Sequence, residues 1–81
     1  MLITWDEPKR LANLAKHGVD FADLDEGFFL GSRVRPTRHG RFQAIGHTDG
    51  SILSVVFAPL GREAIAIISA RPASRTERKI L

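Results

Sequence analysis

The sequence predicts an α+β domain over residues 1–81, with the element order β-α-α-β-β-β-β-α and a mostly antiparallel sheet. Two N-terminal helices and a short C-terminal helix are expected to pack on this sheet. Three observations predict this class. Helical spacing marks residues 7–30, apolar or alternating runs fill residues 41–71, and Asp49-Gly50 joins two of those runs as a tight hairpin. A chain of 81 residues suits a single domain and leaves no room for a separate cofactor domain.

The first helix is expected to follow a short strand at residues 2–5 and to end near His17. Asp6 is a suitable N-cap, Pro8 lies where its missing N–H costs nothing, and Gly18 is the usual left-handed residue after a helix. At about 100° per residue, the helix has an apolar face and an opposite polar face. The apolar face carries Leu11, Leu14 and Ala15, and the polar face carries Lys9, Asn13 and Lys16, with His17 beside it.

The second helix is expected to begin at Asp20, because the apolar residues that follow recur at helical spacing. Phe21, Leu24 and Phe28 stand at i, i+3 and i+7, and Gly31 lies just past the expected end. These three side chains are predicted to belong to the core.

The rest of the chain reads as strands. Residues 33–35 predict an edge strand, because Pro36 argues against a central position. Residues 41–48 alternate, residues 52–58 are nearly all apolar as in a strand covered on both faces, and residues 63–71 form the last strand. Simple alternation places Arg71 on the same face as Ile65 and Ile67. A capping box, Ser74-x-x-Glu77, then begins a short basic helix.

Positive charge is concentrated in the second half of the chain. Residues 1–30 carry three basic and six acidic groups, a net charge of −3, whereas residues 31–81 carry nine basic and three acidic groups, a net charge of +6. Eight of those nine basic groups are arginines, whose planar guanidinium suits phosphate. This distribution is typical of a nucleic-acid-binding protein and is also compatible with an acidic protein partner.

Several chemistries find no support in the sequence. Without cysteine there are no disulfides and no thiolates, which fits a reducing compartment. His17, His39 and His47 fall on different elements without acidic residues at ligand spacing, so we expect no metal and no cofactor. The N-terminus lacks a signal-peptide pattern and no apolar run could span a bilayer, so we expect a cytoplasmic protein with no membrane contact.

The remaining polar residues, cations and imidazoles, are sufficient for one reaction class, the cleavage of RNA by its own 2′-hydroxyl. The protein must remove the 2′ proton, stabilise charge on the phosphoryl oxygens and protonate the leaving 5′ oxygen. Histidine or lysine can exchange the protons, and arginine can bind the phosphoryl oxygens. Other interpretations stay open: Lys9, Asn13 and Lys16 are also typical of a solvated helix face, and His17 could simply end the helix.

Taken together, several of these residues resemble the motifs of the BrnT toxin family. The N-terminal block is Trp5-Asp6-Glu7, Lys9, Asn13 and Lys16-His17-Gly18-Val19-x-Phe21. The later blocks are Arg41, Gly46, Val55-Val56 and Ile67-Ile68-Ser69-Ala70-Arg71-x-Ala73-x-x-x-Glu77-Arg78. The resemblance covers nearly the whole chain.

The resemblance implies a RelE-like fold and the toxin half of a bacterial type II toxin–antitoxin pair. Such toxins are ribonucleases that inhibit translation by acting on RNA, including ribosome-associated mRNA. A ribbon-helix-helix antitoxin neutralises them, and the resulting hetero-oligomer binds operator DNA. The polar positions that match are Lys9, Asn13, Lys16, His17, Arg71, Glu77 and Arg78.

The chain departs from the family at two places. The segment 31–40, with Arg33, Arg35 and Arg38, matches no family motif and is a candidate contact for RNA or for the antitoxin. Family members often carry a tyrosine near the end of the last helix, where this chain has Leu81, and it contains no tyrosine at all. We therefore keep two hypotheses, a metal-independent endoribonuclease and a non-catalytic RNA-binding or protein-interaction module. For the enzyme, the expected catalytic residues are Arg71, His17, Lys16 and Glu77, and the expected RNA-binding residues are Lys9, Asn13, Arg41, Arg75 and Arg78.

Overall fold

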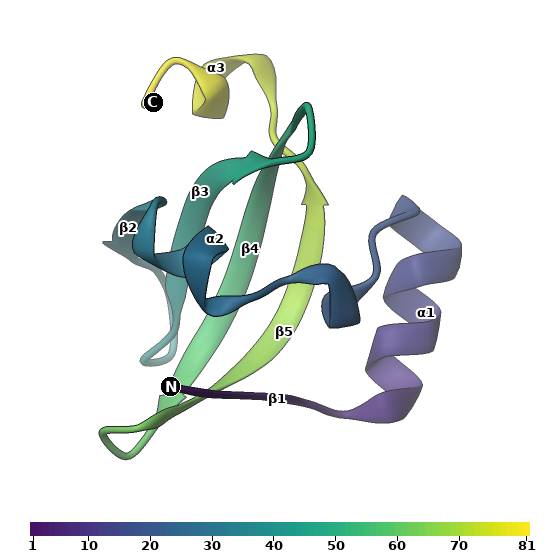
Figure 1. The fold of residues 1–81 in the computed structure, drawn as a ribbon, viewed down its shortest axis with the longest axis vertical. Helices are drawn as coiled ribbons and strands as arrows, with labels where there is room; N and C mark the ends of the chain where they lie inside the picture. Colours follow the sequence, from purple (N-terminus) through teal and green to yellow (C-terminus); the bar gives the residue numbers. More distant parts are fainter.

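The computed structural model describes residues 1–81 as a five-stranded sheet with three α-helices and one 3-10 turn (Figure 1). The elements are β1 (Leu2–Trp5), α1 (Glu7–His17), η1 (Phe21–Asp23), α2 (Glu26–Leu30), β2 (Arg33–Pro36), β3 (Phe42–Thr48), β4 (Ser51–Leu60), β5 (Ala64–Pro72) and α3 (Arg75–Arg78). The strand order is β1-β5-β4-β3-β2, with β1 parallel to β5 and every other pair antiparallel. The predicted fold class is confirmed.

The hairpin between β3 and β4 has the predicted turn. Thr48 pairs with Ser51 across the Asp49-Gly50 dipeptide. Asp49 and Gly50 have φ values of 30° and 81°, and positive φ at both central residues is the mark of a type I′ turn. This turn fixes the register of β3 against β4, and with it the face on which each polar side chain lies.

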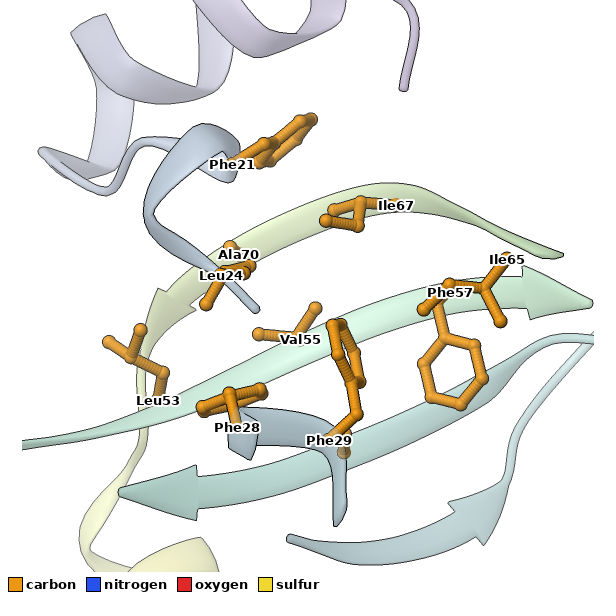
Figure 2. Packing of buried hydrophobic residues seen from close by; sticks show 11 residues of the cluster. Phe21, Leu24, Phe28, Phe29, Leu53, Val55, Phe57, Ile65, Ile67 and Ala70 are labelled. Carbon is orange, nitrogen blue, oxygen red and sulfur yellow. The ribbon is translucent and has the colours of Figure 1, made fainter. Parts of the chain in front are cut away.

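The hydrophobic core lies on one face of the sheet, under η1 and α2 (Figure 2). Phe28 packs edge-on against Phe29, and Phe29 packs edge-on against Phe57 of β4. Close packing of α2 on β3 also explains Gly46, because a Cβ there would lie 2.9 Å from Cβ of Ser32. The core residues are Phe21, Leu24, Phe28, Phe29, Ala44, Leu53, Val55, Phe57, Ile65, Ile67 and Ala70.

The expected second helix is broken into two pieces, which corrects the sequence-based prediction. Asp20 caps only the three-residue turn η1, by accepting a hydrogen bond from the Ala22 N–H. Leu24 is extended, and Asp25 then caps α2 through the Phe28 N–H. A second N-cap aspartate thus restarts the helix. The predicted core residues of this segment are nevertheless buried.

Helix α1 presents its polar side to the protein. Leu11 and Leu14 are 53% and 36% exposed, whereas Asn13 is only 8% exposed. The Asn13 side chain accepts a hydrogen bond from the Ala70 N–H and donates to the Ala70 and Val19 carbonyls. β1 pairs with β5 only as far as Ile67, so Asn13 satisfies the free backbone edge of β5 beyond that point. The interpretation of Asn13 as part of a solvated face is therefore wrong.

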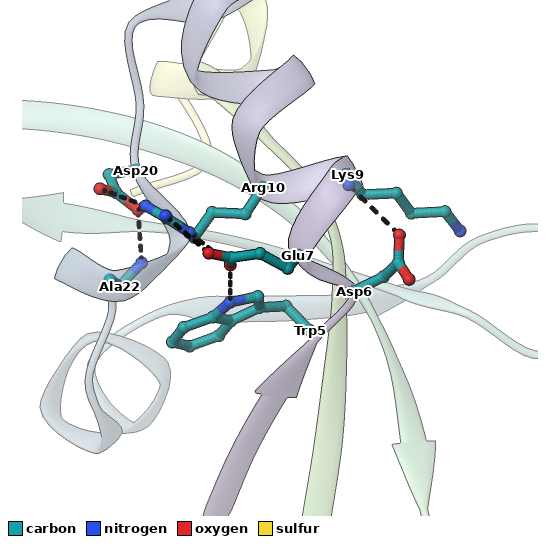
Figure 3. A network of polar contacts seen from close by, with 7 residues as sticks. All are labelled: Trp5, Asp6, Glu7, Lys9, Arg10, Asp20 and Ala22. Carbon is teal, nitrogen blue, oxygen red and sulfur yellow. Dashed lines mark hydrogen bonds and ion pairs between the residues drawn. The ribbon is translucent and has the colours of Figure 1, made fainter.

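A second polar network fixes the start of α1 (Figure 3). Arg10 donates to both carboxylate oxygens of Glu7 and both of Asp20, and the Trp5 indole N–H donates to Glu7. The hydrogen bonds that Glu7 accepts from Arg10, followed by the one from Trp5, lower the pKa of Glu7 to about 2. Arg10 is thereby committed to joining β1, α1 and the loop before η1, and it is not free to bind a ligand.

A β-bulge changes the face on which Arg71 lies. Phe57 pairs with Ile67 while Val56 pairs with Ser69, so β5 contains one extra residue at this point. Ile65 and Ile67 face the core before the bulge, and Ala70 faces it afterwards. Arg71 therefore lies on the face opposite to Ile65 and Ile67, contrary to the prediction from simple alternation.

Candidate functional site

The sheet face opposite the core is polar and basic. One cross-strand row joins Arg33 of β2, Ile45 of β3, Ser54 of β4 and Arg71 of β5. The next row joins Arg35, Gln43, Val56 and Ser69. We call the polar members of these two rows the basic face: Arg33, Arg35, Gln43, Ser54, Ser69 and Arg71.

Arg71 is held on the basic face by Glu77 of α3. Its Nη1 and Nη2 atoms donate to the two Glu77 carboxylate oxygens over 2.7 and 2.8 Å. The Arg71 side chain is 42% exposed and that of Glu77 only 11% exposed, so the pair lies at the surface with its carboxylate on the inner side. Such a bidentate pair fixes the orientation of the guanidinium.

The Glu77 carboxylate has no acceptor position left. Besides the two bonds from Arg71, it accepts one from the Ser74 N–H and one from the Gln43 amide, each over 2.8 Å. The bond from Arg71 is the largest cause that lowers the pKa of Glu77 to about 2. A carboxylate with so low a pKa and four donors is a poor proton acceptor near neutral pH, so its geometry suits positioning.

Gln43 connects the centre of the basic face to its edge. Its amide nitrogen donates to Ser54 Oγ over 2.7 Å as well as to Glu77, and its oxygen accepts from Arg35 Nε over 2.7 Å. One amide thus links Arg35 on the edge strand to the Arg71–Glu77 pair. Sequence reasoning missed Gln43, although the alternation of residues 41–48 already placed it on one face with Ile45.

A shallow groove of about 330 Å³ runs between α1 and β5. Ser69 lines this groove and is also part of the basic face, two residues before Arg71 on β5. The groove therefore opens beside Arg71. The residues that line it are Lys9, Ala12, Asn13, Lys16, His17, Ile68 and Ser69.

The structure brings most of the sequence-predicted site residues to this region. Lys9, Lys16 and His17 line the groove, Arg71 and Glu77 lie on the adjoining face, and Arg75 and Arg78 are exposed on α3. Two predicted RNA-binding residues are placed differently. The amide of Asn13 is already used by the backbone of β5, and Arg41 precedes β3, four residues from the row that contains Arg71.

Apart from Arg71, the cations around this region lack acidic partners. The ion pairs of the molecule are Met1–Glu26, Arg10–Glu7, Arg10–Asp20 and Arg71–Glu77. None of them involves Lys9, Lys16, Arg33 or Arg35. Unpaired guanidinium and ammonium groups on one surface create a positive potential that attracts a polyanion.

Two further surfaces differ in character. A hollow of about 420 Å³ is lined by Asp20, Asp23 and Asp49 among others, and its carboxylates would repel phosphate. No group of three or more histidine, aspartate or glutamate side chains is placed to hold a metal ion. None of the helices is both long and apolar enough to cross a membrane.

Fold and surface together define a small α+β domain whose sheet face opposite the core carries arginines suited to an anionic polymer. The family of this chain is shown by a family model described as "Ribonuclease toxin, BrnT, of type II toxin-antitoxin system", which matches residues 5–77. The chain belongs to this family of ribonuclease toxins. Membership implies an RNA substrate and an antitoxin partner.

A solved structure supports the same conclusion. The Brucella abortus ribonuclease toxin, BrnT, whose crystal structure is known at 1.1 Å resolution, is 54% identical to this chain in sequence. The two structures superpose with a TM-score of 0.87. The match covers 93% of this chain and 99% of that chain. No curated protein matches the chain.

Proposed function

We propose that the protein is an endoribonuclease toxin that cleaves RNA by attack of its 2′-hydroxyl, without a metal ion, and thereby inhibits translation. The observation that carries the proposal is the surface on which the α1–β5 groove, lined by Lys16 and His17, shares Ser69 with the face that holds the Arg71–Glu77 pair. This surface provides proton-exchanging groups beside a fixed guanidinium, and the 2′-hydroxyl provides the nucleophile.

Arg71 stabilises the phosphoryl oxygens in this proposal. Glu77 occupies the Nη1 and Nη2 ends of the guanidinium, which leaves the Nε–H and the second Nη2 hydrogen free as another fork. Two parallel donors match two phosphoryl oxygens. Glu77 serves here as a positioning residue, since its carboxylate is saturated.

His17 or Lys16 exchanges protons with the 2′-hydroxyl and the leaving 5′ oxygen. Both line the groove beside Ser69, and His17 is half-buried at the end of α1. Lys9, Arg41, Arg75 and Arg78 contact the RNA backbone. Asn13 supports the site by holding α1 against β5.

Cleavage assays with site variants test these roles. We expect cleavage of RNA to persist in EDTA, and the rate to fall by about 10²-fold or more in Arg71→Ala and in His17→Ala. Arg62→Ala is the matched control, because Arg62 lies beside Met1, Leu2 and Glu63, away from the groove. Cleavage that vanishes in EDTA, or that is unchanged in both site variants, would overturn the proposal.

The cellular function is tested by expression. We propose that a ribbon-helix-helix antitoxin neutralises the toxin and that their complex binds operator DNA. Expression of the toxin alone should arrest growth and reduce protein synthesis, and co-expression of such an antitoxin should restore both. Growth that continues with the toxin alone, at a verified protein level, would contradict this function.

The lack of tyrosine favours a second candidate function, a non-catalytic RNA-binding or protein-interaction module. Such a module would bind RNA with a steep salt dependence but leave it intact. Binding and cleavage measured on the same RNA separate the two functions.

A further inference from the structure

We propose that Arg33 and Arg35 of β2 form a second binding subsite for the RNA backbone, across the sheet from the Arg71–Glu77 pair. This inference rests on the proposed function, because it assigns a further part of the same RNA strand to a surface that the catalytic proposal does not use. β2 is the outermost strand of the sheet, and all four of its residues are exposed.

The strand register places both arginines on the basic face. Arg33 pairs with Ile45 and Arg35 pairs with Gln43, and both partners point away from the core side that carries Ala44. Arg33 and Arg71 occupy the same cross-strand row, three strand spacings apart. At about 4.8 Å per spacing, their Cα atoms are separated by roughly 14–15 Å. Ile45 and Ser54, which lie between them in the row, are buried, so an RNA strand would meet the guanidinium groups at the two ends of the row and not the side chains between them.

The donors of the two arginines are largely free. Arg33 makes no side-chain hydrogen bond or ion pair, and Arg35 uses only Nε, toward the neutral oxygen of Gln43. This bond leaves the Nη groups of Arg35 available and restrains the side chain. The restraint continues through Gln43 to Glu77 and Arg71, so the two ends of the face are joined by hydrogen bonds.

The charge pattern suits an anionic partner, and the ribonuclease family of this chain makes RNA the occupant that we assign. The only carboxylate that contacts the basic face is Glu77, and it is neutralised by Arg71. Between the arginines, Ile45 and Ser54 are buried, and the Gln43 amide is engaged by Ser54 and Glu77. Exposed arginines on an edge strand can also simply prevent sheets from associating, which makes no prediction for RNA affinity.

Binding of an uncleavable RNA tests the subsite. The probe is a single-stranded RNA oligonucleotide with 2′-O-methyl groups, which cannot undergo attack by a 2′-hydroxyl. We expect Arg33→Gln/Arg35→Gln to weaken binding by about tenfold or more at moderate salt. The slope of the logarithm of the binding constant against the logarithm of the salt concentration should become shallower by about 1.4. Each phosphate contact on a single strand contributes about 0.7 to this slope. Arg62→Gln, which removes one charge from the β4–β5 turn, should bind with nearly unchanged affinity.

Conservative variants and cleavage kinetics separate a phosphate contact from a structural effect. Arg33→Lys/Arg35→Lys should retain the salt dependence of the wild type, because it retains both charges. On cleavable RNA, the glutamine variants should raise KM and leave kcat within about twofold. Wild-type protein that binds the probe but cleaves no RNA would sink the proposed function and leave the subsite standing. Unchanged probe binding in the double glutamine variant would overturn the subsite alone, as would a loss of antitoxin binding without any loss of RNA binding.

Discussion

At the scale of single residues, Asn13 was predicted to bind RNA and Glu77 to take part in catalysis, and the structure shows which groups each of them contacts. Both belong to matching motifs, and both are largely buried with all their hydrogen-bonding groups engaged. Spacing along the chain revealed only the bond between Glu77 and Ser74, because Ala70 lies 57 residues from Asn13 and Gln43 lies 34 residues from Glu77 in the sequence.

Asn13→Ala should lower the stability of the protein. The substitution leaves the Ala70 N–H and C=O without partners at the edge of β5, which costs about 2–3 kcal/mol of unfolding free energy. Urea unfolding measures this loss. The salt dependence of RNA binding by the folded variant should remain that of the wild type, because no charge is removed. A shallower salt dependence with unchanged stability would identify Asn13 as an RNA contact instead.

The Arg71–Glu77 pair predicts a pH dependence of stability. Because folding lowers the pKa of Glu77 from 4.5 to about 2, the pair stabilises the folded state above about pH 4.5. This contribution, on the order of 2 kcal/mol, is lost as the pH falls toward 2. Glu77→Gln removes the ionisation, so its unfolding free energy should fall less over the same range. Glu7 titrates equally in both proteins, and equal losses in both would refute the effect of Glu77.

At the scale of elements, the sequence predicted well which helices and strands exist and in what order. It predicted less well which face of an element is buried and whether a helix is continuous. The hairpin, the capping box and the caps of α1 depend on local chemistry and are present as predicted. The bulge in β5 depends on pairing between distant segments, whereas the break after η1 follows from the local cap Asp25, which the helical spacing of the apolar residues concealed. The placement of α1 likewise reflects the need to satisfy the edge of β5, which outweighs burial of Leu11. Arg71 was therefore predicted as a site residue, but it was placed on the wrong face of the sheet.

Gly46→Ala should destabilise the packing of α2 on β3. A Cβ at this position would lie 2.9 Å from Cβ of Ser32 and 3.2 Å from the ring of Phe28, so the helix must shift. We expect a loss of about 1–3 kcal/mol, measured by denaturant unfolding. Gly31→Ala is the control, since its nearest contact would be an ordinary 3.4 Å and its φ is −89°. Equal stability of the two variants would contradict the packing argument.

At the scale of the whole molecule, the fold gathers basic residues on one surface. In the sequence the charge differs only between the two halves of the chain. The second half carries a net charge of +6, and the sheet gathers Arg33, Arg35 and Arg71 on the face opposite the core. Helix α1, from the acidic first half, then adds Lys9, Lys16 and His17 at the edge of that face. Composition left both a nucleic acid and an acidic protein open as partners, and only the antiparallel register shows which residues share a surface.

The chemical nature of the RNA ends after cleavage tests the central claim most directly. Attack by the 2′-hydroxyl releases a 5′-hydroxyl and leaves a 2′,3′-cyclic phosphate, or the 3′-phosphate formed from it. Mass spectrometry of the products, from a reaction in EDTA, should find these ends with the wild type and very little product with Arg71→Ala. Products that carry 5′-phosphate and 3′-hydroxyl ends would show that water, and not the 2′-hydroxyl, is the nucleophile, and would contradict the account.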